Sequence, residues 1–159
     1  MTLYLKQRIF TISDKYSIFD ENEDPVFNVE KQFFSIPSRF IISDINGNEL
    51  FVLKKNFTLF LASYDIYKGY YLCASVQKEL SFFKAKFSVK SQYGNFVIDG
   101  DIFDHNFSIL KDGISIGSVN KKLFAFSDSY VLDIIDDKNA AFFCALVIAI
   151  DNCMHNQNN

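Results

Sequence analysis

The sequence contains little of what most metal-binding and catalytic sites are built from. Its 159 residues include two histidines, three cysteines, two prolines and no tryptophan. His105 and His155 lack metal-ligand spacing, and no cysteine pair forms a Cys-x-x-Cys motif. Cys73, Cys144 and Cys153 are odd in number, which favours reduced thiols that pack as small apolar side chains in the cytoplasm. We therefore expect no metal, no cofactor and no catalytic residues.

No segment is long enough to cross a membrane as a helix, and neither sign of charge dominates. A spanning helix needs about 20 apolar residues, whereas the apolar segment 139–150 is bounded by Asp137-Lys138 and Asp151. The first eight residues have no apolar signal-peptide core. A formal net charge of −3 gives no general attraction to nucleic acid. The sequence predicts a cytoplasmic protein, either free or peripheral at a membrane, with no transmembrane segment and no nucleic-acid partner.

What the sequence has in abundance is aromatic and strand-favouring residues. Nineteen Phe and eight Tyr make up the aromatic content of 17%, which favours strands and argues against disorder. About twelve short strand-like runs follow one another at the spacing of an all-β barrel or sandwich. No linker or low-complexity segment divides them, so residues 1–159 should form one domain. The expected strand centres are Leu5, Tyr16, Val29, Ile41, Val52, Phe60, Leu72, Phe87, Phe96, Phe107, Ile116 and Val131.

The C-terminal segment departs from this pattern, because residues 139–154 are predicted to form a helix that is apolar on every side. Such a helix has to be buried all round or lie in lipid. Asp136 or Asp137 can serve as its N-cap. A barrel of about twelve strands is too wide for its own side chains to fill. The sequence therefore predicts a closed antiparallel barrel of about twelve strands wrapped around a C-terminal hydrophobic α-helix.

Two tandem units near the N-terminus repeat after 24 residues, where Phe10-Thr11-Ile12 returns as Phe34-Ser35-Ile36 and Asp20 matches Asp44. Each unit is predicted to fold as strand, acidic turn, strand, and the second turns at Asn46-Gly47, a strong hairpin signal. The acidic turns resemble the start of a calcium loop. They lack the distant glutamate and the flanking helices of an EF-hand, so turn chemistry explains them fully.

A shorter pattern, aliphatic–any–Lys–any–apolar, ends four of the predicted strands. Alternate strands of an up-and-down barrel run the same way, so these lysines should gather at one rim and the acidic turns around Asp20, Asp44 and Asp112 at the other. A basic rim can hold phosphate headgroups or an acidic partner. Alternatively, the lysines protect strand edges and keep the rim soluble. The candidate residues are Lys31, Lys54, Lys55, Lys78, Lys121 and Lys122.

The whole chain resembles the LURP-one-related family of the tubby C-terminal-like superfamily, which also includes the phospholipid scramblases. The resemblance implies a twelve-stranded barrel around a C-terminal helix. Tubby proteins bind phosphoinositides, and scramblases are linked to calcium and lipid movement. This sequence has neither a long acidic calcium loop beside the helix nor a cysteine-rich palmitoylation segment. The resemblance rests on Leu5-Lys6-Gln7-Arg8-Ile9-Phe10, on the tandem units with Asp44-Ile45-Asn46-Gly47-Asn48, on the lysine-containing strand ends and on the closing Ala149-Ile150-Asp151.

Three functions remain open from the sequence. The first is a non-catalytic cytoplasmic binding or scaffold protein that recognises anionic phospholipid or a protein partner through its basic rim. The second is a scramblase-type lipid-handling protein whose helix leaves the barrel, although the short helix and its polar flanks count against it. The third is an enzyme acting at the barrel mouth, which the lack of a convergent nucleophile, base or metal set disfavours. We expect the first.

Overall fold

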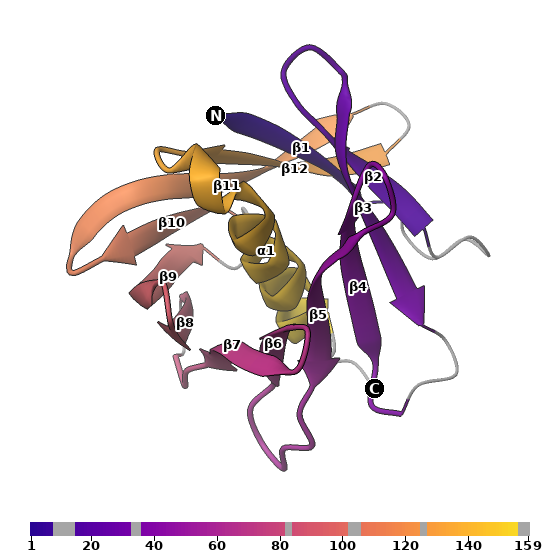
Figure 1. Ribbon diagram of the computed structural model, residues 1–159. Helices are drawn as coiled ribbons and strands as arrows, with labels where there is room; N and C mark the ends of the chain where they lie inside the picture. Colours follow the sequence, from indigo (N-terminus) through magenta and orange to yellow (C-terminus); the bar gives the residue numbers. More distant parts are fainter. Residues whose placement is uncertain (8–14, 33–35, 82–83, 102–105, 125–126, 156–159) are drawn as a thin grey trace.

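The computed structural model confirms the closed antiparallel barrel, and it describes residues 1–7, 15–32, 36–81, 84–101, 106–124 and 127–155 (Figure 1). Each strand pairs with its neighbours in chain order, and the last strand closes onto the first. The strands are β1 Thr2–Gln7, β2 Lys15–Phe19, β3 Pro25–Gln32, β4 Arg39–Asp44, β5 Glu49–Lys55, β6 Ser63–Lys68, β7 Tyr71–Lys78, β8 Ala85–Ser91, β9 Gly94–Asp101, β10 Asn106–Lys111, β11 Ile114–Phe124 and β12 Ser127–Ile134.

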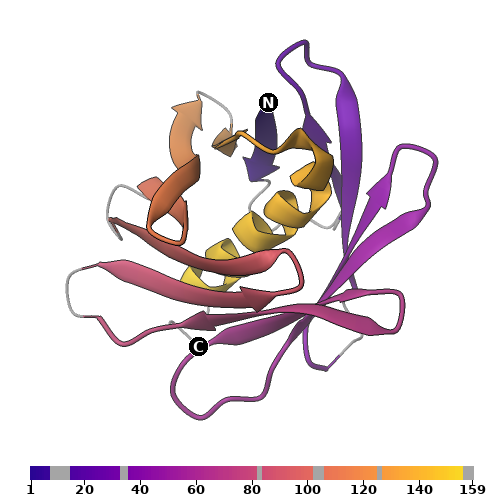
Figure 2. The ribbon, with the colours of Figure 1, turned by 60° about the vertical axis from the view of Figure 1, so that its left-hand side comes forward.

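The predicted apolar helix, α1 (Ala140–His155), runs through the interior of this barrel (Figure 2). A short 3-10 helix, η1 (Asp137–Asn139), precedes it. Asp136 is the N-cap of η1, because its carboxylate accepts hydrogen bonds from the Lys138 backbone N–H at 3.1 Å and from Asn139 Nδ2 at 2.6 Å. All residues from 142 to 150 are buried. The helix is therefore enclosed on every side, as its composition predicts.

Aromatic side chains fill the space between the helix and the strands. Phe142 is packed among Phe51, Phe96 and Tyr93, with ring centroids 6.1, 6.1 and 4.5 Å away. Phe143 meets Phe96 edge-on at 5.8 Å. Such tilted and edge-on pairs add to the stability that burial alone supplies. These rings help to fill the wide interior of the barrel.

The 24-residue repeat corresponds to two turns with the same backbone hydrogen bonds. In the first, the Asp20 carboxylate accepts hydrogen bonds from the backbone N–H groups of residues 22 and 24, each at 2.9 Å. In the second, the Asp44 carboxylate accepts from those of residues 46 and 48, at 2.9 and 2.8 Å. Glu23 and Gly47, which are 24 residues apart, both have positive φ angles of 66° and 87°. The part of the repeat at residues 10–12 and 34–35 lies outside the described residues.

One of the expected strands is wrong. A strand was predicted around Phe60, but β6 begins at Ser63, and Phe60 lies in the β5–β6 loop with 91% of its surface exposed. The run from Phe57 to Leu61 has the aromatic and aliphatic composition of a strand. It lacks the alternation of a half-buried strand, because Leu59 and Phe60 are adjacent and both exposed. Composition alone, without the alternation of apolar and polar positions, therefore predicted a strand in the wrong place.

Candidate functional site: the two ends of the barrel

Strand direction gives the barrel two chemically different ends. We call the end where β3, β5, β7 and β11 finish the lysine end, and the opposite end, which carries the acidic turns, the turn end. The strand registers place each lysine beside a residue near the start of the neighbouring strand. Lys31 lies opposite Phe40, Lys54 opposite Arg39, and Lys55 opposite Tyr64. Lys78 lies opposite Phe87, and Lys121 opposite Tyr130. The structure therefore places all six candidate lysines at the lysine end, away from Asp20, Asp44 and Asp112.

The six lysines form two sets that face opposite sides of the barrel wall. In a strand, residues two apart lie on the same face. Val29, Leu53, Val76 and Val119 are buried against the interior, so the lysine two positions after each of them also faces inward. These inner lysines are Lys31, Lys55, Lys78 and Lys121, whereas the outer lysines, Lys54 and Lys122, face solvent. The picture of one exposed rim is corrected here, most clearly by Lys78, which is only 9% exposed.

Aromatic rings accompany two of these lysines, one from each set. Nζ of Lys31 lies 5.9 Å from the centre of the buried Phe40 ring. Nζ of Lys54 lies 4.6 Å above the ring of Tyr67. A cation over an aromatic face is attracted by the ring quadrupole. These contacts hold the lysine stems in place at the barrel end.

The C-terminus of α1 reaches the same end as the inner lysines. Burial raises the pKa of the Cys153 thiol to about 12, and the positive charges of Lys78 and Lys55 act in the opposite direction. Burial also holds the pKa of Lys78 below its usual value. Two residues earlier on the helix, Asp151 accepts a hydrogen bond of 2.7 Å from the Tyr130 hydroxyl. Two of the inner lysines, Lys55 and Lys78, thus lie near the negative end of the helix dipole.

The buried titratable groups of the interior are poor nucleophiles and poor metal ligands. Burial raises the pKa of Cys144 far above its usual range, and that of Tyr16 rises through burial and the nearby Asp151 carboxylate. A thiol in such surroundings stays protonated at neutral pH. In the described part of the chain, no three His, Cys, Asp or Glu side chains gather as a metal site would require. His105 and the side chain of His155 lie outside the described residues.

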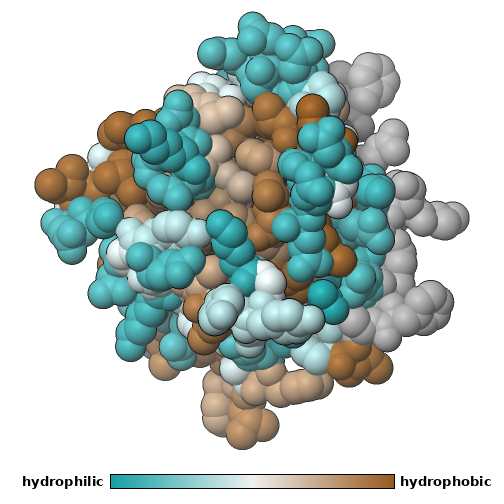
Figure 3. Space-filling model, viewed as in Figure 1, coloured by the Kyte–Doolittle hydropathy of each residue, from teal (hydrophilic) through white to brown (hydrophobic). Residues whose placement is uncertain are grey.

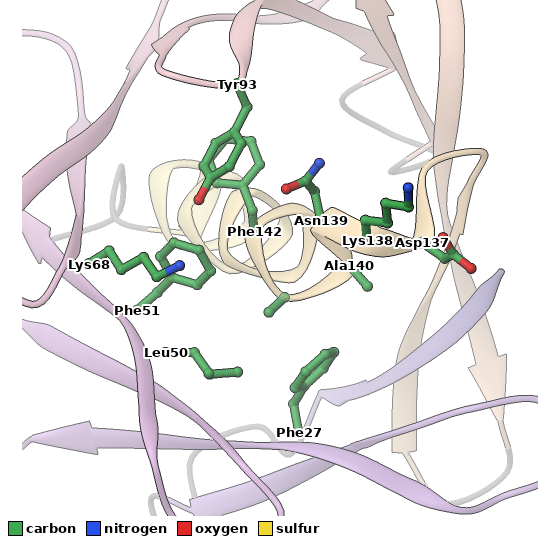
Figure 4. Close-up of a pocket in the computed structure, with 11 residues that line it drawn as sticks. Phe27, Leu50, Phe51, Lys68, Tyr93, Asp137, Lys138, Asn139, Ala140 and Phe142 are labelled. Carbon is green, nitrogen blue, oxygen red and sulfur yellow. The ribbon is translucent and has the colours of Figure 1, made fainter.

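The turn end contains a small cavity that the sequence did not indicate (Figure 4). Its volume is about 260 Å³. Tyr93 on one side, and Phe27 and Leu50 on the other, lie around the beginning of α1, with Lys68 and Lys138 at the polar edge. The residues that line the cavity come from segments that are far apart in the sequence, so no sequence motif indicates the cavity. Its size is slightly below the usual range of ligand pockets, about 300–1,000 Å³.

The lysine end also carries a set of exposed apolar side chains that sequence reasoning missed. They lie at Ile36 in the β3–β4 loop, on the β5–β6 loop (residues 56–62), and at Leu80 in the β7–β8 loop. The β5–β6 loop projects below the body of the barrel in Figure 1, and light brown, apolar atoms form the lowest point of Figure 3. The exposed fractions are 89% for Ile36, 81% for Phe57, 93% for Leu59, 91% for Phe60 and 86% for Leu80.

Comparison with known proteins assigns the chain to a family without assigning an activity. The chain is 31% identical over 155 residues to the uncharacterized protein YxjI of Bacillus subtilis (strain 168). The alignment covers 97% of this chain and 94% of that protein. No solved structure matches. Within the described residues, no helix combines the length and apolar character needed to cross a bilayer. The family model for LURP-one-related proteins matches residues 1–151, and the chain belongs to that family.

Proposed function

We propose that this protein is a non-catalytic binding protein whose lysine end holds the anionic headgroups of a phospholipid surface. The observation that carries the proposal is the convergence of the inner and outer lysines on one end of the barrel. Each lysine near an anionic membrane contributes about 1 kcal/mol of attraction. Several of them on one end therefore supply a useful affinity while the net charge of the whole chain, −3, stays mildly negative.

The alternative reading of these lysines, protection of strand edges, fits the barrel poorly. A closed barrel has no free edge strand to protect, and β12 closes onto β1. The inner lysines also face the interior, where they shield no backbone. For Lys78, burial disfavours the charged form and so opposes stability. A charge retained against this cost is more readily explained by binding than by folding.

The other two functions have weaker support. In a scramblase-type protein the helix would leave the barrel, but α1 contacts the strands on every side and carries the buried core residues 142–150. An enzyme at the barrel mouth would need an activated nucleophile, whereas burial raises the pKa values of Cys144 and Cys153. A protein partner with an acidic surface would compete for the same lysines and is tested by the same variants.

Vesicle co-sedimentation tests the proposal. Wild-type protein should pellet with vesicles of phosphatidylcholine and phosphatidylserine at low salt, and high salt should weaken the binding, because exposed charges are screened beyond about 10 Å at 0.1 M salt. Replacing Lys31, Lys55 and Lys121 by Gln should weaken binding by roughly a hundredfold.

The matched control changes two lysines of the turn end, Lys68→Gln and Lys138→Gln. It lowers the net charge of the protein in the same direction while leaving the lysine end intact, so its binding should stay close to that of the wild type. Absence of wild-type binding at low salt, or an equal loss in both variants, would contradict a headgroup site at the lysine end.

A further inference from the structure

We infer that the lysine end inserts the apolar tips of three loops into an anionic bilayer, so that the barrel stands on the membrane by that end. The inference rests on the proposed function, because the lysines must first bring this end to the surface. It adds a specific interface: apolar side chains below the headgroups and lysines level with them.

The three loops lie next to one another. Each connects two strands that are neighbours in the barrel, and together they join β3 to β8 without a break in the strand order. All three cross from a strand that ends at the lysine end to one that begins there. Their described apolar residues therefore lie on the same side of this end.

Their exposed apolar residues form a set, which distinguishes them from the single exposed hydrophobics found on most proteins. The β5–β6 loop is the centre of the set, because residues 56–62 contain no charged side chain. Phe57, Leu59 and Phe60 on this loop expose more than four-fifths of their surface. Ile36 and Leu80 extend the apolar surface to the loops on either side.

Positive charge lies directly behind these tips. Lys54 and Lys55 precede the β5–β6 loop, and Lys78 and Lys84 flank the β7–β8 loop. The carboxylate of Glu79, in that same loop, is paired with Lys86 at 3.3 Å. Apolar residues ahead of a basic belt are the arrangement that anchors peripheral proteins at an anionic membrane, where the apolar part enters the acyl boundary.

The turn end provides an internal comparison, since it also exposes apolar side chains. The exposed fractions there are 61% for Ile45, 100% for Tyr70, 80% for Tyr71, 54% for Leu72, 69% for Ile114 and 79% for Ile135. These side chains lie at the end that carries the acidic turns around Asp20 and Asp44, whose charge repels an anionic surface. The turn end also carries Lys68 and Lys138, so its charge is mixed, whereas lysines adjoin the apolar tips of the lysine end.

The absence of tryptophan makes the inference directly testable, because one substitution introduces a unique fluorescent reporter. Phe60→Trp places an indole on the β5–β6 loop, and Tyr70→Trp places one at the turn end as the matched control. With vesicles of phosphatidylcholine containing about one-third phosphatidylserine, the emission of Phe60→Trp should move to shorter wavelength. Lipids with brominated acyl chains should quench it, and the Tyr70→Trp emission should stay unchanged.

Affinity gives a second measurement. Phe57→Gln, Leu59→Gln and Phe60→Gln together should weaken vesicle binding by about a thousandfold, because burying each such side chain is worth roughly a factor of ten. The control triple variant, Tyr70→Gln, Tyr71→Gln and Ile114→Gln, should bind like the wild type. All six positions are exposed, so both variants should remain folded.

The outcomes separate insertion from headgroup binding. Pelleting with vesicles without any change in the Phe60→Trp emission would overturn insertion and leave the proposed function in place. No pelleting at low salt would overturn both. A shift and quenching at Tyr70→Trp in place of Phe60→Trp would overturn the assigned orientation, and with it this inference.

Discussion

Lys78 carries its charge in a place that water hardly reaches. It is 9% exposed and points toward the end of α1, near the buried Cys153. Desolvation lowers its pKa, so its protonated form is less favourable in the folded chain than in the unfolded chain. The unfolded chain then binds the proton more readily. The contribution of Lys78 to stability consequently rises with pH as the pH passes from its folded pKa to its ordinary value of 10.5.

We predict that Lys78→Met stabilises the protein by about 1 kcal/mol, because an apolar side chain replaces a poorly solvated charge. Cys144, Cys153 and Tyr16, whose pKa values burial raises, make stability fall at alkaline pH, and Lys78 partly offsets that fall. Stability should therefore fall more steeply with rising pH in the variant than in the wild type. Urea unfolding at neutral and alkaline pH measures both effects. Lys54→Met, on the outer face of the same end, is the control and should change stability by no more than about 0.5 kcal/mol. A Lys78→Met variant less stable than the wild type would show that its ammonium group stabilises the fold.

The inward direction of the inner lysines is present in the sequence pattern, although the sequence analysis did not predict it. Each follows a buried aliphatic residue by two positions, as Lys55 follows Leu53, so its inward direction could be predicted from strand alternation alone. The extent of burial could not. Lys31 and Lys55 are half-buried while Lys78 is buried, and this difference depends on the three-dimensional packing around each side chain.

At the scale of elements, the two turns of the repeat solve the same geometric problem with different residues. Both begin with an aspartate that accepts two backbone hydrogen bonds, and both need a positive φ three residues later. Gly47 meets this need without strain, whereas Glu23 has a side chain that disfavours the conformation. The match of Asp20 to Asp44 predicted the shared turn. The strain at position 23 follows only once the φ angle is known.

We predict that Glu23→Gly stabilises the protein by about 0.5–1 kcal/mol and that Gly47→Glu destabilises it by about 1 kcal/mol or more. Thermal unfolding of both variants beside the wild type measures the two changes. Because the turns are equivalent, the effects should have opposite signs. Effects of the same sign would show that the two loops are held by different forces.

The loops mark the limit of sequence reasoning at this scale. The strands around them were predicted from composition and spacing, and eleven of the twelve expected centres fall within or beside an observed strand. The twelfth, Phe60, failed because an exposed apolar loop has the same composition as a strand. Prediction from sequence patterns assumes that apolar residues are buried. Exposed apolar residues such as Phe60 do not meet that assumption.

For the whole molecule, the decisive feature is a barrel that is filled by its own chain. A wide barrel needs side chains to fill its interior, and a short apolar helix needs to be covered from solvent. The helix fills the barrel, and the barrel covers the helix. This reciprocal need could be predicted from the sequence, because helix and strands are both recognisable by pattern. The cavity at the turn end could not be, since it depends on small mismatches in packing around Phe142.

We predict that Ala145→Asp or Leu146→Asp prevents folding, since either would bury an unpaired charge at a cost of several kcal/mol. Both sites are fully buried. Circular dichroism and size-exclusion chromatography should report an unfolded or aggregated chain. Lys138→Asp, an exposed change just before the helix, is the control and should leave the fold intact. A Leu146→Asp variant with the wild-type melting temperature would contradict the enclosed helix.

The closure of β12 onto β1 has a consequence for how the chain is made. The Met1 amino group donates to the Ile134 carbonyl at 3.0 Å, and the Thr2 hydroxyl donates to the Asp133 carboxylate at 2.7 Å. These contacts join residues at opposite ends of the sequence, and α1 follows all twelve strands. During translation every strand therefore emerges before the core it will enclose. Folding has to wait for the helix, and contacts of such long sequence separation form slowly. The strands of the barrel wall thus leave the ribosome before the helix that forms its core.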